Sequence, residues 1–141
     1  YVQEFSNRSG IQVVLNCSPT LERLPSDMET AIFRIVQESL GNVHRHSGSQ
    51  TATIRLEVQD GKACLEISDD GKGIPPNKQQ EVESSARAGV GIRGMRERIA
   101  QFGGVMQIQS SGKGTTILAE MPYKRTSHNE VAPGVPGSKP A

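Results

Sequence analysis

The fold is decided by one stretch, Ile67-Ser68-Asp69-Asp70-Gly71-Lys72-Gly73-Ile74, where an alternating apolar segment ends in a glycine-rich turn. A carboxylate fixed at the end of a strand can accept a hydrogen bond from an exocyclic amine such as that of adenine. The glycines allow the backbone to turn tightly and to approach a ligand closely. The same residues also suit an ordinary surface turn, so their interpretation depends on the segments around them.

Apolar periodicity on both sides of this stretch predicts two hairpins. Residues 53–58 and 63–68 alternate between apolar and polar, and Asp60-Gly61 between them is a strong hairpin signal. Residues 105–110 and 115–121 form a second expected strand pair. The chain should therefore contain a sheet built largely from antiparallel neighbours.

Apolar side chains three and four residues apart predict two helices. The first extends from Ser26 to about His46, and Ser26 with Glu29 matches a capping box. The second has its apolar stripe from Ile92 onward and stops at Gly103-Gly104. Residues 71–89 between the strands and this helix are polar, contain two prolines and predict a mobile loop.

The N-terminal residues predict the end of a helix followed by a strand. Tyr1, Val2 and Phe5 lie at helical spacing, Gly10 breaks the pattern, and residues 11–15 suit a strand. The resulting order is strand, helix, two strands, loop, helix, two strands. This order predicts an α+β fold, a two-layer sandwich with a mixed, mainly antiparallel sheet covered on one face by helices.

Composition limits the classes of protein to consider. The 141 residues contain 34% hydrophobic and 4% aromatic residues and carry a net charge of +1, which gives no basic excess for nucleic acid or an anionic membrane. Cys17 and Cys64 have neither disulfide-framework nor metal spacing. No apolar run approaches the roughly 18 residues needed to span a bilayer. We expect a cytoplasmic domain without direct membrane contact, from a parent that can still be anchored elsewhere.

Three parts of the chain are expected. Residues 1–9 are interpreted as the end of a preceding helix, residues 10–123 as one domain, and residues 124–141 as a tail rich in proline and glycine that cannot build a core. The start within a helix suggests a piece cut from a longer protein.

The first predicted helix carries a polar line of side chains. Glu38 and Asn42 lie one turn apart on one face, and His46 extends the line. A carboxylate and an amide in this arrangement can hold Mg²⁺, which takes oxygen ligands and keeps several waters. Arg45 could reach a phosphate, although an ordinary solvated helix face explains the same residues. His44 and His46 point to different sides of a helix and do not suggest a metal pair.

Two further glycine clusters follow. Gly89-Val90-Gly91-Ile92-Arg93-Gly94 matches Gly-x-Gly-x-x-Gly, but a dinucleotide fold requires an apolar strand just before it, and the preceding residues are polar. The cluster therefore predicts a glycine-rich entry to a helix, whose N–H groups and dipole suit phosphate oxygens. Gly112-Lys113-Gly114-Thr115-Thr116 alone indicates only a hairpin turn.

Together and in this order, the four clusters resemble the N, G1, G2 and G3 boxes of the GHKL ATPase superfamily of gyrase, heat-shock chaperones, histidine kinases and mismatch-repair proteins. The resemblance covers about Gly10 to Pro122 and implies the Bergerat fold. More closely, Arg23-Leu24-Pro25 and residues 33–43 and 91–98 resemble histidine kinases that partner helix-turn-helix response regulators of the nitrate-response type.

The resemblance implies a site for ATP and Mg²⁺. Asn42 would be the metal ligand, and Glu38 a catalytic residue that polarises water or positions the metal site. Asp69 would read adenine above a pocket floor shaped by Gly71 and Gly73. The remaining implied nucleotide-binding residues, three of them glycines that would act as lid hinges, are Arg45, His46, Gly89, Gly91, Ile92, Gly94 and Thr115. Arg45 replaces a common Lys, and His44 stands where an apolar residue is usual.

The expected function is the catalytic domain of a sensor histidine kinase, which presents the γ-phosphate of Mg·ATP to a histidine for relay to a response regulator. His44, His46 and His128 do not look like phosphoacceptors, so the acceptor is expected on a dimerisation domain outside this chain. The chain alone should then bind nucleotide without autophosphorylation. The alternatives are an anti-sigma-factor serine kinase, an ATPase clamp of the gyrase or mismatch-repair type, and a non-enzymatic nucleotide sensor.

Overall fold

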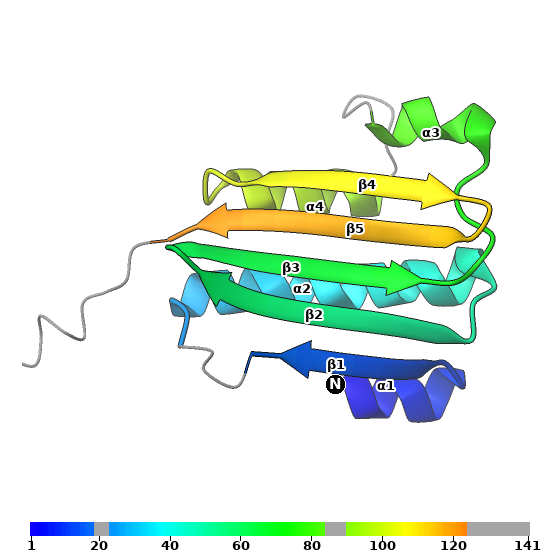
Figure 1. Ribbon diagram of the computed structural model, residues 1–141, viewed down its shortest axis with the longest axis horizontal. Helices are drawn as coiled ribbons and strands as arrows, with labels where there is room; N and C mark the ends of the chain where they lie inside the picture. Colours follow the sequence, from blue (N-terminus) through cyan, green and yellow to red (C-terminus); the bar gives the residue numbers. More distant parts are fainter. Residues whose placement is uncertain (19–22, 84–89, 124–141) are drawn as a thin grey trace, which may run out of the picture.

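A computed structural model describes residues 1–18, 23–83 and 90–123, and Figure 1 shows one sheet with helices behind it. The elements in chain order are α1 (Val2–Ser9), β1 (Gln12–Cys17), α2 (Ser26–Asn42), the π-helical turn η1 (Val43–Ser47), β2 (Thr51–Gln59), β3 (Lys62–Asp69), α3 (Pro76–Glu83), α4 (Val90–Ala100), β4 (Val105–Ser111) and β5 (Gly114–Pro122). The sheet has five strands in the order β1-β2-β3-β5-β4. β1 runs parallel to β2, and the other neighbours are antiparallel.

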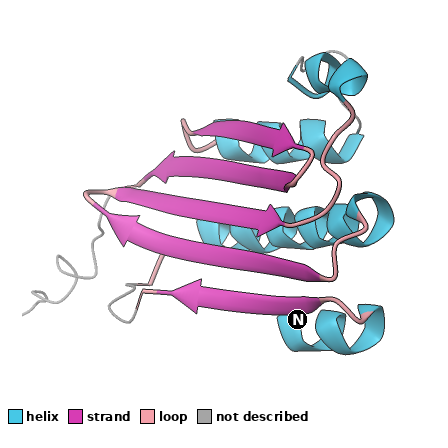
Figure 2. Ribbon diagram, turned by 45° about the vertical axis from the view of Figure 1, so that its right-hand side comes forward, coloured by secondary structure: helices cyan, strands magenta, loops and turns pink. Residues whose placement is uncertain are grey.

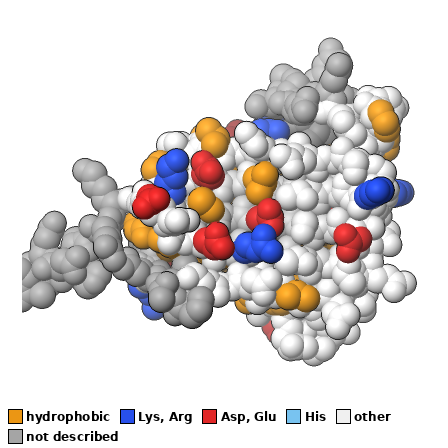
Figure 3. Space-filling view, viewed as in Figure 1, with side chains coloured by type: hydrophobic (Ala, Val, Ile, Leu, Met, Phe, Trp, Pro, Cys, Tyr) orange, Lys and Arg blue, Asp and Glu red, His pale blue; other side chains and the backbone are white. Residues whose placement is uncertain are grey.

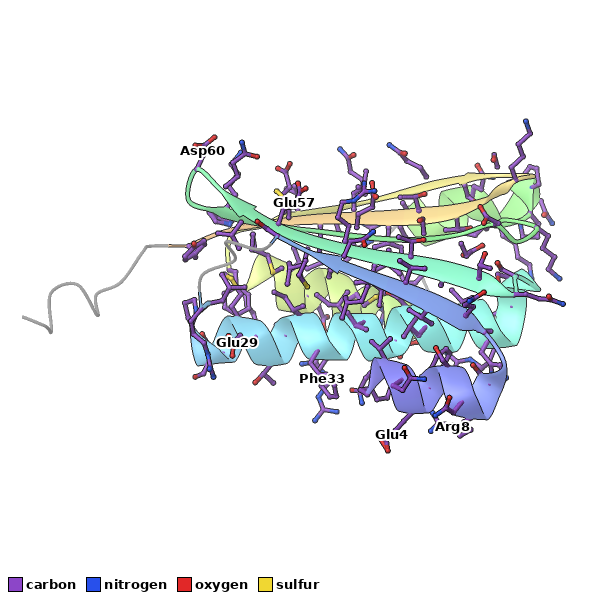
Figure 4. The ribbon with its side chains drawn as sticks, turned by 60° about the horizontal axis from the view of Figure 1, so that its bottom comes forward. Glu4, Arg8, Glu29, Phe33, Glu57 and Asp60 are labelled. Carbon is purple, nitrogen blue, oxygen red and sulfur yellow. The ribbon has the colours of Figure 1, made fainter. Side chains whose placement is uncertain are left out.

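The helices cover a single face of the sheet, which confirms the α+β two-layer fold. Figure 2 shows α1, α2 and α4 on the same side of the strands. In Figure 4, Phe33 and Glu29 project from the helical layer, whereas Glu57 and Asp60 lie on the opposite side of the molecule. Figure 3 shows the face of the sheet that the helices leave uncovered, where charges of both signs mix. Arg55 of β2 and Glu66 of β3 form an ion pair at 3.0 Å.

The core lies between the sheet and α2, as the two periodicities predict. On α2 the side chains of Met28, Ile35 and Leu40 are almost completely buried. Alternate residues of the central strands meet them, including Ile54 of β2 and Leu65 of β3. Every second side chain of a strand, and about one in 3.6 along the helix, points into the space between the two layers. The layers can therefore share one apolar interior.

The N-terminal helix contributes to this core. Phe5 of α1 is buried, and its ring packs edge-on to the imidazole of His44, with 6.3 Å between ring centroids. This contact accounts for a histidine at a position where an apolar residue was expected, because the ring can pack while the side chain stays largely exposed.

Two local expectations from the sequence were wrong. Pro25, not Ser26, is the N-cap of α2, and no side chain caps the helix, so the capping box does not form. Within the expected loop, residues Pro76–Glu83 form α3. The loop was predicted from the polar composition and the two prolines, but the first turn of a helix tolerates proline because its missing N–H would have no intrahelical partner. Residues 84–89 and the expected tail lie outside the described residues.

Among the described residues, no helix is both long enough and apolar enough to cross a membrane.

Candidate functional site

The polar clusters of the sequence converge on one pocket of about 610 Å³, between the end of α2, the start of α4 and the strands β3 and β5. This volume lies within the usual range for small-molecule sites, about 300–1,000 Å³. The expected site residues that line it are Glu38, Asn42, Arg45, His46, Asp69, Gly73, Gly91, Ile92 and Thr115. Gly71 and Gly94 do not line it, and Gly89 lies outside the described residues.

Asp69 is the last residue of β3 and stands at one end of the pocket. Its Oδ1 accepts a hydrogen bond from the Gly71 N–H at 2.8 Å. Burial raises the pKa of Asp69 above its ordinary value; the backbone N–H groups of Gly71 and Thr115 pull the pKa down, and the charge of Asp70 raises it. The side chain is therefore a half-buried acceptor held in a fixed direction.

The turn after Asp69 is fixed by close backbone contacts on two sides. A Cβ on Gly71 would collide with the carbonyl oxygen of Ser47, to which the Lys72 N–H donates at 2.9 Å. Gly73 has a φ of +77°, and a Cβ there would collide with the carbonyl oxygen of Ser111. Glycine is required at both positions because the turn is clamped between η1 and the β4–β5 hairpin.

The end of α2 supplies the second half of the site. The Arg45 guanidinium donates through Nη2 to Asn42 Oδ1 at 3.0 Å and to Glu38 Oε2 at 3.3 Å. One cationic group thus contacts an amide oxygen and a carboxylate oxygen one helical turn apart. Oxygen ligands that converge on one cation have the chemistry that Mg²⁺ requires, so the residues present fit a magnesium site here.

The first turn of α4 closes the pocket opposite Glu38. The first described turn of α4 starts at Val90, and the N–H groups near a helix N-terminus suit an anionic ligand. A Cβ on Gly91 would collide with Glu38 Oε2, whereas a Cβ on Gly94 would meet nothing within 4 Å. Both glycines lie within helical backbone, and their expected role as lid hinges remains a prediction.

Several lining residues were missed from the sequence. Ile67, Ile108 and Ile117 form an apolar wall from three adjacent strands. Lys72 and Lys78 add two cations to the lining. The isoleucines were assigned to strands but not to the site, because strand alternation alone does not say which inward residues stay uncovered by helices.

Comparison with known protein families identifies the family to which this chain belongs. The family model described as "Histidine kinase-, DNA gyrase B-, and HSP90-like ATPase" matches residues 27–125, from the second residue of α2 to beyond the end of β5. The chain belongs to this ATPase family. The chain is therefore an ATP-binding domain of this family.

Curated relatives of this ATPase domain are sensor kinases. The chain is 37% identical over 118 residues to the sensor histidine kinase MctS of Rhizobium johnstonii, covering 84% of this chain and 25% of the relative. It is 32% identical over 120 residues to the sensor histidine kinase NarS of Mycobacterium tuberculosis, covering 85% of this chain and 27% of that one. The ATPase domain thus spans about a quarter of the length of these relatives.

Solved structures share the fold of the ATPase domain. The histidine kinase domain of the Erythrobacter litoralis EL346 blue-light activated kinase matches with a TM-score of 0.69 and 22% identity, over 86% of this chain and 57% of that chain. The mycobacterial sensor histidine kinase MprB matches with a TM-score of 0.65 and 22% identity, over 85% and 87% of the two chains. At these identities the likeness concerns the fold.

The contrast between the two glycines of α4 gives a first prediction. Alanine is favoured over glycine within helices by about 1 kcal/mol, so Gly94→Ala should raise the melting temperature and keep ADP affinity. Gly91→Ala gains the same propensity but displaces the Glu38 carboxylate, so calorimetric titration should show weaker Mg·ADP binding. Equal Mg·ADP affinities in the two variants would contradict the contact between Gly91 and Glu38. Weaker Mg·ADP binding by Gly94→Ala would support the role of Gly94 as a hinge.

The raised pKa of Asp69 gives a second prediction. An ionised carboxyl with a raised pKa costs folding free energy; the cost is absent below the unfolded value, about 4, and develops as pH rises through the folded value. Asp69→Asn should therefore be more stable than the wild type to urea near neutral pH, by a margin that shrinks towards acid pH. Asp60→Asn, on the exposed β2–β3 turn, should change the unfolding free energy by less than about 0.5 kcal/mol. A destabilised Asp69→Asn at neutral pH would show that ionised Asp69 holds its loop together.

Proposed function

We propose that this ATPase domain is the catalytic domain of a sensor histidine kinase, which positions Mg·ATP so that its γ-phosphate reaches a histidine on another domain. The observation that carries the proposal is that one pocket is lined both by Asp69 and by the Asn42–Glu38–Arg45 cluster. The sensor histidine kinases MctS and NarS, related over more than four fifths of the chain, support the same assignment.

The Asp69 end of the pocket suits the adenine base. The half-buried carboxylate can accept a hydrogen bond from the adenine amine. Ile67, Ile108 and Ile117 offer an apolar wall against which a flat ring can pack. A donor-bearing aromatic ring is the ligand that uses both features, because an unpaired buried acceptor would cost binding free energy.

The α2 end suits the phosphates and the metal. Asn42 would bind Mg²⁺, which when bound neutralises phosphate charge, and Glu38 would orient the site, since it contacts both Arg45 and the start of α4. Arg45 and His46 line the same wall and offer donors for phosphate oxygens. Phosphoryl transfer depends mainly on positioning and electrostatic stabilisation, so this set of residues suffices for the domain's part in it.

The phosphate acceptor is proposed to lie outside this chain. Of the two histidines within the described residues, His44 packs on Phe5 and His46 lines the pocket itself. A separate dimerisation domain of the parent protein would present the acceptor histidine, and a response regulator of the helix-turn-helix kind would then receive the phosphate. The serine-kinase, ATPase-clamp and nucleotide-sensor alternatives are not favoured, because the relatives are sensor histidine kinases.

Labelled ATP tests the proposal directly. The domain should bind Mg·ATP, and incubation with γ-labelled ATP should leave it unlabelled. Joined to the preceding segment of its parent protein, it should place acid-labile, base-stable phosphate on a histidine of that segment. Label on the isolated domain, or acid-stable label on a serine, would contradict the proposal.

The metal assignment predicts a linkage between Asn42 and Mg²⁺. Asn42→Ala should weaken ADP binding at least about tenfold when Mg²⁺ is present, which is the loss typical even of groups that only support a ligand. Binding measured in a metal chelator should change much less. Gln37→Ala, on the same helix but outside the pocket lining, serves as the control. Equal losses of affinity with and without metal would remove Asn42 from the metal site.

A further inference from the structure

The hydroxyl of Ser110 connects the segments that enclose the Asp69 end of the pocket. Ser110 lies near the end of β4, in register with Thr115 of β5. The Ile74 N–H donates to Ser110 Oγ at 2.6 Å, and Ser110 Oγ lies 3.0 Å from Thr115 Oγ1. One half-buried side chain therefore ties the turn after Asp69 to both strands of the last hairpin.

A serine hydroxyl has one proton to donate and two lone pairs with which it can accept. Since Ser110 Oγ accepts from Ile74, its own proton can go to Thr115 Oγ1 at 3.0 Å or to the Gly114 carbonyl oxygen at 3.5 Å. O–H···O bonds between protein groups measure about 2.5–3.0 Å, so Thr115 is the better acceptor. Either hydroxyl could be the donor of this bond. When Ser110 donates, Thr115 Oγ1 accepts and keeps its own proton to donate elsewhere.

Thr115 is also a neighbour of Asp69. Thr115 lines the pocket, and its backbone N–H is close enough to the Asp69 carboxylate to lower the pKa of that group. With the Thr115 proton left to donate, the pocket presents an acceptor, the Asp69 carboxylate, together with a donor, the Thr115 hydroxyl. Adenine carries the complementary pair on one edge, an amine donor next to a ring-nitrogen acceptor. A 6-oxopurine such as hypoxanthine carries the reverse pair, an oxygen acceptor next to an N–H donor.

We propose that Ser110 is a positioning residue that orients the Thr115 hydroxyl as a donor and so sets the preference of the pocket for adenine over 6-oxopurines. The inference rests on the proposed ATP-binding function and adds to it a specificity device. Without the Ser110 hydroxyl, Thr115 Oγ1 can rotate and accept from an N–H as readily as it donates. Base selectivity should then fall even where the fold is kept.

The test compares dissociation constants for Mg·ADP and Mg·IDP, by calorimetric titration and by competition. Ser110→Ala should weaken ADP binding about tenfold, as expected for the loss of one net hydrogen bond, while IDP binding stays the same or strengthens. The dissociation constant for IDP divided by that for ADP should therefore fall about tenfold. Ser110→Thr keeps a hydroxyl on Cβ and should restore the ratio. Ser111→Ala, next to it on β4, should retain the wild-type ratio.

Two outcomes would overturn the role of Ser110: an unchanged ratio in Ser110→Ala, or equal losses of ADP and IDP binding, as a general loosening of the site would give. Thr115→Val tests the same claim from the partner side, should Ser110→Ala not fold, and should narrow the ratio equally. Failure of the wild-type domain to bind Mg·ADP at all would instead refute the proposed function, which separates the two claims.

Discussion

The structure depends on three close backbone approaches around the turn that follows β3. Gly71 contacts the Ser47 carbonyl, Gly73 contacts the Ser111 carbonyl, and Gly114 lies against the carbonyl of Asp69. A side chain at any of these positions would separate segments that now meet. Because η1, β4 and β5 all contact the same turn, its backbone is held in place, and the Gly71 N–H of that turn holds Asp69 Oδ1 by a hydrogen bond at 2.8 Å.

The two sides of the pocket suit different parts of a nucleotide. The sheet side provides a fixed acceptor and an apolar wall, which suit a base, and the helix side provides oxygens, cations and helix N–H groups, which suit a metal and phosphates. The Arg45 guanidinium hydrogen-bonds to Asn42 and Glu38 in this structure. It has to release the Asn42 oxygen before a metal binds there, and the freed guanidinium can then turn to a phosphate.

The sequence predicted the elements whose burial has a simple period. The hairpin strands and the apolar stripe of α2 were predicted because each residue's neighbours lie a fixed number of positions away. α3 was missed because its residues are mostly polar and form no apolar stripe, and because Pro75 and Pro76 suit a loop. Taken alone, Asp69 also suited an ordinary surface turn, and Asn42 also suited an ordinary solvated helix face. The order of the four polar and glycine clusters along the chain is what predicted one common site. Ser110 was not predictable, because its partner Ile74 lies 36 residues away and no pattern of spacing records that contact.

The central claim is that one pocket holds the base at Asp69 and the metal at Asn42. A crystal structure of the domain with Mg·ADP tests it most directly. The account predicts the adenine amine within about 3 Å of an Asp69 carboxylate oxygen, a normal hydrogen-bond distance, and the metal bound to Asn42 Oδ1. A nucleotide bound with its base away from Asp69, or a metal held without Asn42, would contradict the account.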